Sequence, residues 1–270
     1  MRGDAPRWIV FTDLDGTLLD HDDYSWRAAA PAIERLRRLG VPLSLCSSKT
    51  RVEMESIRRD LDNHDPFVVE NGAAIYGAGE GTEPELLAPP RLKWLETLHT
   101  IRQRRGFRFV GFADFTLDEI REHTGLGAAA ARAAAQRDGT EPLLWLDEHH
   151  APDDLARALA PHGLRLVQGG RFWHVMGKDV DKGYAVRRLA ARYRGCAPRL
   201  RTVALGDSAN DVGMLRAVDH PVVIPRPHGP ALDPGPLPGL LRAPSPGPVG
   251  WRWAIDHLLD AFDSSDDTEA

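Results

Sequence analysis

The sequence predicts an α/β fold, in which a doubly wound, Rossmann-like core with a parallel sheet is interrupted by an inserted α+β cap domain. Two observations predict it. Short apolar runs without polar alternation are followed by helical patterns near both ends of the chain, as in sheets buried on both faces. The middle of the chain has a different order of elements. We therefore expect a core made of residues 1–80 and 178–270, with residues 81–177 as the inserted cap.

Strands and helices alternate in the first part of the chain. Residues 8–12 form a short apolar run, which predicts a buried strand. Residues 28–39 place Ala32, Ile33 and Leu36 at helical spacing, and Gly40 stands where a C-cap glycine belongs. The same alternation predicts a strand at 41–46, a helix at 52–61 and a third strand at 66–70. This order implies right-handed crossovers in one parallel sheet.

The pattern changes after residue 77. Residues 77–90 are rich in Gly, Pro and Glu, which is typical of a linker. Beyond them we expect helices and strands in a mixed order, with helices at 117–126, 128–137 and 152–160 and strands at 143–146, 164–168 and 172–175. This order favours helices on one face of a small antiparallel sheet.

The alternation of helix and strand returns near the end of the chain. We expect helices at 182–193 and 211–217 and strands at 202–205 and 222–224, followed by a loop rich in Pro and Gly at 225–248. Residues 249–262 carry tryptophans and leucines at helical spacing, and residues 263–270 form a polar tail. The parallel core is therefore expected to use both ends of the chain.

Composition excludes several classes of protein. The 270 residues include 34 basic and 39 acidic side chains, a net charge of −5, without the basic footprint of a nucleic-acid-binding protein. No apolar stretch reaches the ~18 residues of a membrane span, and the N-terminus lacks the apolar region of a secretory signal. We therefore expect a cytoplasmic protein with neither a nucleic-acid nor a membrane partner. Two cysteines, Cys46 and Cys196, exclude a disulfide scaffold or a zinc ribbon.

Two carboxylates follow the first predicted strand. Asp13 and Asp15 lie in the segment DLDGT, at the carboxyl end of that strand, where open α/β sheets bind ligands. A calcium loop of the EF-hand type needs glycine at its sixth position, whereas here the glycine comes fourth. The alternative is an ordinary turn built from Asp and Gly.

A second carboxylate pair follows the strand predicted at 202–205. Asp207 and Asp211 lie four residues apart in GDSAND, so they face the same side as the next helix begins. A simple N-cap cluster would have the same residues. The two pairs together, each directly after a buried strand of one sheet, indicate a site for a hard cation, Mg²⁺.

Lysine and serine residues add a possible phosphate site. Only four of the 34 basic residues are lysines, so Lys182, at the predicted start of a helix, suggests a need for a compact point charge. Its presence by chance is the alternative. Ser47 and Ser48 follow the second predicted strand and offer hydroxyl and main-chain N–H groups to a phosphate oxygen. The alternative is that they only form the N-cap of the next helix.

These motifs, in this order, resemble the haloacid dehalogenase superfamily of phosphohydrolases. The resemblance rests on DxDGT at 13–17, a serine after the second strand, DKG at 181–183 and GDSxND at 206–211. The long middle segment resembles the large cap that one branch of the superfamily inserts. Within that branch the chain resembles the mannosyl-3-phosphoglycerate phosphatase family, through residues 47–51, 69–73, 169–174 and 246–248.

The resemblance implies a phosphoaspartyl mechanism. Asp13 is expected to attack phosphorus, and Asp15 to protonate the leaving alkoxide and then to deprotonate the attacking water. Ser47 and Lys182 are expected to hold phosphate oxygens. Mg²⁺ is expected to be bound by Asp13, the main-chain carbonyl of Asp15 and Asp207, with Asp211 supporting the site through water or by orienting Lys182.

The leaving group should be recognised by other residues. Arg171 is a candidate for binding a glycerate carboxylate through two hydrogen bonds, although it also fits a surface charge. The further candidates for the substrate-binding set are Lys49, Asn71, Glu141, His174, Ser208 and Asn210. His174 also fits a strand histidine with a structural role, and Lys49 a structural pair partner.

The resemblance implies a Mg²⁺-dependent phosphatase, monomer or homodimer, that converts mannosyl-3-phosphoglycerate to mannosylglycerate and phosphate. A phosphatase of glucosyl-3-phosphoglycerate or of another sugar phosphate is the alternative. A phosphomutase or phosphotransferase would pass the phosphoryl group to a sugar hydroxyl instead of water.

Overall fold

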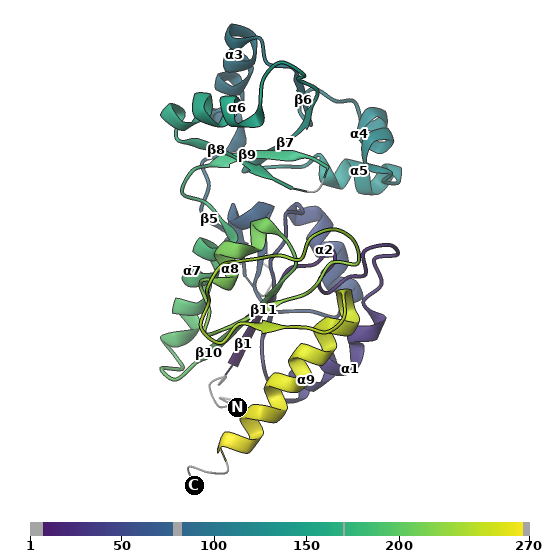
Figure 1. The fold of residues 1–270 in the computed structure, drawn as a ribbon, viewed down its shortest axis with the longest axis vertical. Helices are drawn as coiled ribbons and strands as arrows, with labels where there is room; N and C mark the ends of the chain where they lie inside the picture. Colours follow the sequence, from purple (N-terminus) through teal and green to yellow (C-terminus); the bar gives the residue numbers. More distant parts are fainter. Residues whose placement is uncertain (1–7, 78–82, 170, 267–270) are drawn as a thin grey trace. The chain divides into compact units, whose positions relative to one another are not determined.

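The computed structural model describes residues 8–77, 83–169 and 171–266 (Figure 1). The chain divides into two compact units. The first unit combines the N-terminal residues up to 46 with the C-terminal residues from 186, and the second contains residues 47–185. The first unit thus takes residues from both ends of the chain, whereas the predicted core of residues 1–80 and 178–270 stays a prediction.

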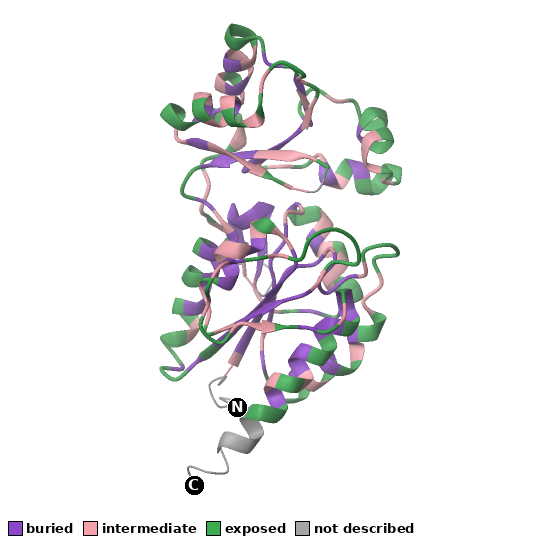
Figure 2. Cartoon of the chain, viewed as in Figure 1, coloured by how far each residue is buried: buried purple, intermediate pink, exposed green. Residues whose placement is uncertain are grey.

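The first unit is built on a five-stranded parallel sheet with the order β12-β11-β10-β1-β2. Its strands are β1 (Trp8–Thr12), β2 (Leu43–Leu45), β10 (Arg201–Gly206), β11 (His220–Val223) and β12 (Leu241–Arg242). β1 pairs with β10 in register, from Trp8 opposite Arg201 to Thr12 opposite Leu205. Figure 2 shows these central strands as mainly buried, which explains their apolar sequences.

Helices of the first unit bury apolar faces that the sequence pattern predicts. They are α1 (Ala30–Arg38), most of α7 (Lys182–Arg194), α8 (Val212–Leu215) and α9 (Gly247–Asp266). α1 buries Ala32, Ile33 and Leu36. Arg35 of α1 forms ion pairs with Asp256 and with Asp260 of α9. The loop predicted at 225–248 is present over residues 225–246, apart from the two residues of β12, and α9 begins at Gly247.

The second unit contains a three-stranded antiparallel sheet with the order β3-β4-β5. These strands are β3 (Phe67–Val69), β4 (Ala74–Tyr76) and β5 (Glu85–Leu86), and α2 (Arg51–Asp60) precedes them. The sequence predicted β3 as a strand of the parallel sheet, and this part of the prediction was wrong. The chain reverses at Glu70, Asn71 and Gly72, which have φ angles of 49°, 57° and 101°, so β4 returns antiparallel along β3.

A four-stranded antiparallel sheet forms the rest of the second unit, with the order β6-β7-β9-β8. Its strands are β6 (Phe109–Gly111), β7 (Thr140–Trp145), β8 (Leu164–Gln168) and β9 (Trp173–Gly177), and the helices are α3 (Leu95–Arg105), α4 (Leu117–Thr124), α5 (Ala128–Ala134) and α6 (Pro152–Leu159). Leu98 and Ile101 of α3 share one hydrophobic core with Leu155 of α6 and the sheet. The predicted α+β layer is confirmed, whereas α3 and β6 were not predicted.

Among the described residues, short 3₁₀ helices occur at five places, η1 (Arg27–Ala29), η2 (Glu70–Gly72), η3 (Arg91–Lys93), η4 (Ala160–His162) and η5 (Ala209–Asp211). No helix in the described part of the chain is long and apolar enough to cross a membrane.

Residues 47–76 group with the inserted segment, whereas the sequence assigned them to the core. Hydrogen bonds within the second unit explain this grouping. The Thr50 hydroxyl donates to the Ala133 carbonyl, and Arg137 donates to the Ser48 carbonyl. The boundaries of the insertion at residues 80 and 177 stay a prediction.

Candidate functional site

Asp13 stands at the carboxyl end of β1. Its main-chain N–H donates to the Leu205 carbonyl, so the pairing of β1 with β10 continues to this residue. The Thr12 hydroxyl donates to the Asp13 carbonyl and accepts a hydrogen bond from the indole N–H of Trp251, a fully buried residue of α9. A rigid strand end therefore positions the Asp13 carboxylate, which is 6% exposed.

Gly16 turns the chain after Asp13. Its N–H donates to the Leu19 carbonyl, and its φ of 78° lies in the left-handed region. A Cβ atom at this position would lie 3.1 Å from Oδ2 of Asp207. Glycine thus lets the loop that carries the half-buried Asp15 pass close to the end of β10.

Asp211 organises the loop that follows β10. Its Oδ2 accepts hydrogen bonds from the main-chain N–H of Asp207 and from both the N–H and the hydroxyl of Ser208. A Cβ atom on Gly206 would lie 2.5 Å from the Asp211 Cβ, so only glycine allows this packing. Asp211 therefore makes the hydrogen bonds of an N-cap cluster and also belongs to the group of converging carboxylates.

The carboxylates of Asp13, Asp207 and Asp211 form one buried group. One oxygen of each lies within 4.8 Å of the other two, and the three residues are between 0% and 6% exposed. Like charges at this distance repel unless a cation or protons compensate them. An all-oxygen donor set suits a hard divalent cation such as Mg²⁺. The predicted convergence at the ends of β1 and β10 is present, and the residues fit the predicted metal.

Arg226 was not predicted as a site residue. It follows β11, and its Nε donates to Oδ2 of Asp207 at 2.9 Å. The sequence offered no clear signal, because a lone arginine in a loop dense in Pro and Gly resembles any surface charge. Its guanidinium reduces the negative charge of the carboxylate group.

Replacing Arg226 with glutamine is expected to increase the affinity for Mg²⁺ about two- to fivefold. The half-exposed Arg226 guanidinium competes with Mg²⁺ for the Asp207 carboxylate, and an ion pair of this kind contributes up to about 1 kcal/mol. Isothermal titration calorimetry measures the Kd. Arg216→Gln is the matched control, since Arg216 donates to the Pro234 carbonyl. Weaker Mg²⁺ binding in Arg226→Gln would contradict this role.

Ser47 and Lys182 belong to the second unit. Ser47 is 1% exposed and follows Cys46, the N–H of which donates to the Thr12 carbonyl at the end of β1. Lys182 begins α7 and is fully buried. A buried ammonium group is costly unless it meets negative charge, which is consistent with the predicted role at a phosphate.

Asn71 lies close to Ser47. Its N–H donates to the Ser47 carbonyl at 2.9 Å, and the residue is 4% exposed. Lys49 is half-buried, and its N–H donates to the Ser47 hydroxyl. In the first unit, the Ser208 hydroxyl donates to the Asn210 side chain as well as to Asp211.

Glu141 has a structural environment. It is fully buried, its Oε2 accepts a hydrogen bond from Arg91, and its Oε1 accepts one from the Ala113 N–H. Burial raises the pKa of Glu141, against the lowering effects of these two donors. Because both oxygens are used inside the second unit, we remove Glu141 from the proposed substrate-binding set.

His174 and Arg171 lie at the start of β9 and just before it. Burial, as the larger cause, and the positive charges of Arg137 and Lys182 together lower the pKa of His174 to about 3. The imidazole is therefore neutral, and its Nδ1 has no hydrogen-bond partner among the described residues. Arg171 is exposed and donates to the His123 carbonyl.

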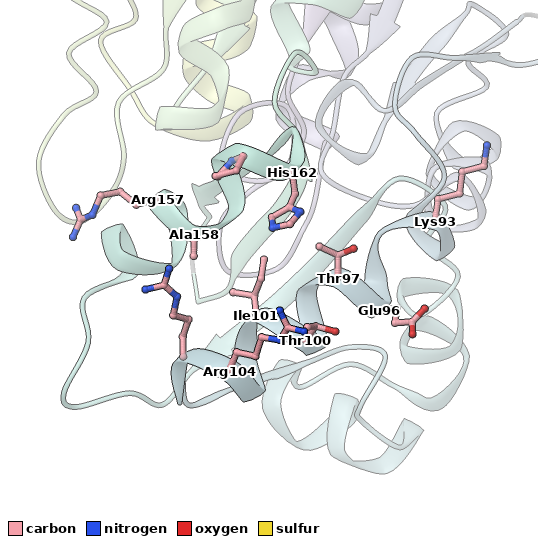
Figure 3. A pocket seen from close by; sticks show the side chains of 11 residues that line it. Lys93, Glu96, Thr97, Thr100, Ile101, Arg104, Arg157, Ala158 and His162 are labelled. Atoms are coloured by element: carbon pink, nitrogen blue, oxygen red, sulfur yellow. The ribbon is translucent and has the colours of Figure 1, made fainter.

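Two cavities of the described chain lie in the second unit. One of about 530 Å³ lies between α3 and the α6–η4 segment and is lined by charged side chains, among them Glu96, Arg104, Arg157 and His162 (Figure 3). The other, of about 400 Å³, borders Glu70. No predicted site residue that the structure describes lines either cavity.

Fold and site together define the class of the protein. Residues 10–93 and 147–226 match the family of haloacid dehalogenase-like hydrolases. The chain belongs to this family, and the protein is a phosphoric monoester hydrolase. The superfamily resemblance seen in the sequence is confirmed.

Two relatives are similar over nearly their whole length, and both carry the name glucosyl-3-phosphoglycerate/mannosyl-3-phosphoglycerate phosphatase. The relative from Methanococcoides burtonii is 39% identical over 93% of this chain and 97% of its own. The relative from Persephonella marina is 37% identical over 94% of this chain and 98% of its own.

Solved structures share the fold. Protein 0175 of Thermoplasma acidophilum is similar with a TM-score of 0.68 and 18% identity, over 92% of this chain and 96% of its own. The sucrose-phosphatase of Synechocystis, solved with sucrose and phosphate, has a TM-score of 0.58 and 17% identity, over 93% and 97%.

Proposed function

We propose that this phosphatase hydrolyses glycosyl-3-phosphoglycerates, with mannosyl-3-phosphoglycerate as its main substrate, to the glycosylglycerate and inorganic phosphate. The similarity to two curated relatives over at least 93% of the chain carries the proposal, since both are named for this substrate class. Their names include the glucosyl compound, which makes glucosyl-3-phosphoglycerate the second candidate. The buried carboxylates at the ends of β1 and β10 support phosphoryl chemistry with a divalent cation.

Asp13 is the proposed nucleophile. In the first step an Asp13 oxygen forms a bond to phosphorus while the bond from phosphorus to the ester oxygen breaks, and Asp15 gives its proton to the departing alkoxide. In the second step Asp15 removes a proton from water, the water oxygen attacks phosphorus, and the bond to Asp13 breaks. Inorganic phosphate leaves, and both carboxyl groups return to their starting states.

Charge compensation decides whether these steps are possible. A carboxylate that approaches a phosphate dianion is repelled, and a bound Mg²⁺ would supply positive charge to the transferring oxygens. Asp13, Asp207 and the Asp15 main-chain carbonyl are the proposed ligands, and Asp211 holds the loop of Asp207. Ser47 and Lys182 are proposed to hold the remaining phosphate oxygens.

Six residues remain as proposed contacts of the leaving group. Arg171 suits the glycerate carboxylate, because guanidinium groups bind carboxylates through two hydrogen bonds. A neutral His174 offers one donor and one acceptor to a hydroxyl group. The other proposed contacts are Lys49, Asn71, Ser208 and Asn210.

A substrate panel tests the proposal. We expect the highest kcat/KM for mannosyl-3-phosphoglycerate, a smaller value for glucosyl-3-phosphoglycerate, and values at least tenfold lower for small sugar phosphates that lack the glycerate carboxylate. A sugar phosphate that outperforms both glycosyl-3-phosphoglycerates would contradict the proposed substrate class. Release of inorganic phosphate without an added acceptor distinguishes hydrolysis from a phosphomutase or phosphotransferase.

Removal of the metal is a separate prediction. EDTA is expected to abolish turnover and Mg²⁺ to restore it, because the carboxylate group repels substrate phosphate when no cation compensates it. Phosphate release is measured before and after dialysis against EDTA, and again after addition of Mg²⁺. Full activity in EDTA after dialysis would contradict the metal dependence.

A further inference from the structure

Glu70 accepts hydrogen bonds from one short segment of the insertion. Its Oε1 accepts from the Asp138 N–H at 2.9 Å. Its Oε2 accepts from the N–H of Gly139 at 3.2 Å and from both the N–H and the hydroxyl of Thr140, at 2.9 and 2.7 Å. The side chain is 2% exposed. A buried carboxylate with this many donors is strongly held, because hydrogen bonds to a charged acceptor are stronger than neutral ones.

The main chain of Glu70 begins an unusual turn. Glu70 and Asn71 have φ angles of 49° and 57°, and Gly72 has a φ of 101°. Residues other than glycine rarely adopt positive φ, so a run of three needs support from its surroundings. The Glu70 carboxylate supplies such support at the first residue of the run.

The opposite side of this turn contacts the residues proposed to hold phosphate. The Glu70 N–H donates to the Lys49 carbonyl, and the Asn71 N–H to the Ser47 carbonyl, both at 2.9 Å. Gly72 lies directly against the chain before Lys182, since a Cβ atom at Gly72 would lie 2.2 Å from the Asp181 carbonyl oxygen and 3.0 Å from the Lys182 nitrogen. The turn therefore sets the position of both segments.

Arg137 also connects the loop at Ser47 with the start of β7. Arg137 donates to the Ser48 carbonyl at 3.2 Å and to the Thr140 hydroxyl at 3.0 Å. Thr140 begins β7, which pairs with β6 and β9 in the antiparallel sheet. The start of β7 is thus joined to the loop at Ser47 both through Glu70 and through Arg137.

We infer that Glu70 is a positioning residue for phosphoryl transfer: by holding the Asp138–Thr140 segment, it keeps the Glu70–Gly72 turn in the conformation that places Ser47 and Lys182. This inference rests on the proposed function of Ser47 and Lys182 as phosphate-holding groups. Glu70 itself does not touch the reacting atoms. Its effect is exerted through main-chain contacts at Ser47, Lys49 and Asp181.

Glu70→Gln is the first test. Glutamine keeps the size of the side chain but replaces one acceptor oxygen with an amino group, which is a donor. Either the Asp138 N–H or the donors of Gly139 and Thr140 then face a second donor. We expect kcat for p-nitrophenyl phosphate to fall about 10- to 100-fold, because small displacements of positioned groups have effects of this size. The inhibition constant of inorganic phosphate should rise at least about tenfold.

The matched control is Glu119→Gln. Glu119 lies in the same unit, where it accepts hydrogen bonds from Thr116 in the capping box of α4. The substitution removes the same charge from a carboxylate that also accepts a main-chain N–H, but Glu119 belongs to the capping box of α4 and not to the Glu70–Gly72 turn. Wild-type kcat and phosphate inhibition are expected. The Kd of Mg²⁺, measured by calorimetry, should be unchanged in both variants.

Two further variants keep the inference open to refutation if Glu70→Gln does not fold. Thr140→Val removes the hydroxyl that donates to Glu70 and accepts from Arg137, but keeps the three main-chain hydrogen bonds to Glu70, so it should give a smaller change in the same two constants. Thr140→Ser retains the hydroxyl and should retain wild-type values. A variant that melts at a lower temperature but has wild-type kcat and phosphate inhibition below that temperature would overturn the inference. In that case Glu70 only stabilises the fold.

The outcome separates the inference from the proposed function. If Lys182→Met retains wild-type activity, the proposed phosphate site is wrong, whatever Glu70→Gln does. If Lys182→Met loses activity and phosphate affinity while all folded variants at Glu70 and Thr140 retain both, the proposed site holds and the role of Glu70 is refuted.

Discussion

Asp13→Asn is expected to lower kcat by at least about 10³-fold, since removal of a covalent nucleophile is among the largest single effects on an enzyme. Asparagine has nearly the same shape as aspartate, but its amide is a poor nucleophile. The fold should be retained, because the substitution removes one of three carboxylates that lie within 4.8 Å of one another. With fewer like charges to compensate, the variant should melt at or above the wild-type temperature in EDTA.

Single-turnover kinetics and mass spectrometry measure this effect. The wild-type enzyme should carry a phosphoryl group after rapid quenching, and Asp13→Asn should carry none. Asp22→Asn is the control, since Asp22 is exposed in the same unit and loses the same charge. A substantial residual kcat, or a trapped phosphoenzyme in Asp13→Asn, would show that another group is the nucleophile.

Lys182→Met is expected to lower kcat/KM about 10²- to 10³-fold, the range found when a preorganised electrostatic group is removed. Methionine is similar in length to lysine and fills the same buried space, so the packing at the start of α7 is largely kept. The lost charge should weaken inhibition by inorganic phosphate as well as slow the reaction. Both effects follow if the ammonium group holds a phosphate oxygen.

A titration of His174 gives a second readout for Lys182→Met. Burial and the positive charges of Arg137 and Lys182 together lower the pKa of His174 to about 3. Removing the Lys182 charge should therefore raise this pKa, which NMR can follow. The control is Lys178→Met, because Lys178 is exposed and lies in the same unit. Unchanged kinetics in Lys182→Met would refute the proposed role, even with the His174 shift present.

Much of the fold was predictable because its buried strands have a simple pattern. β1 and β10 are short apolar runs, and α1 shows its buried residues at helical spacing. α3 was missed because its apolar positions, Leu98 and Ile101 among them, are surrounded by charged residues and pack on a sheet that the helix sequence does not specify. β3 was assigned to the wrong sheet because the prediction followed the alternation of strand and helix and not the Asn71-Gly72 pair, a hairpin signal at the left-handed turn that reverses the chain.

Some residues of the candidate site were likewise predictable from the sequence, and others were not. Asp13 and Asp207 were predictable because parallel strands end at a common edge, so carboxylates that directly follow two neighbouring strands must lie close together. Glu141 resembled a binding residue because the sequence does not show that Arg91, fifty positions earlier, and the Ala113 N–H take up its carboxylate. Arg226 and Glu70 were missed for the same reason.

By itself, the sequence determined the family and its chemistry, the hydrolysis of phosphoric monoesters, because the motifs at residues 13–17, 181–183 and 206–211 are short and local and carry the resemblance to the haloacid dehalogenase superfamily. Only the tertiary structure decided which other charged residues support that chemistry. A carboxylate such as Glu70 or Glu141 acquires its role from the donors that surround it. Those donors come from segments distant in the sequence, and burial makes their hydrogen bonds strong enough to fix the position of each group.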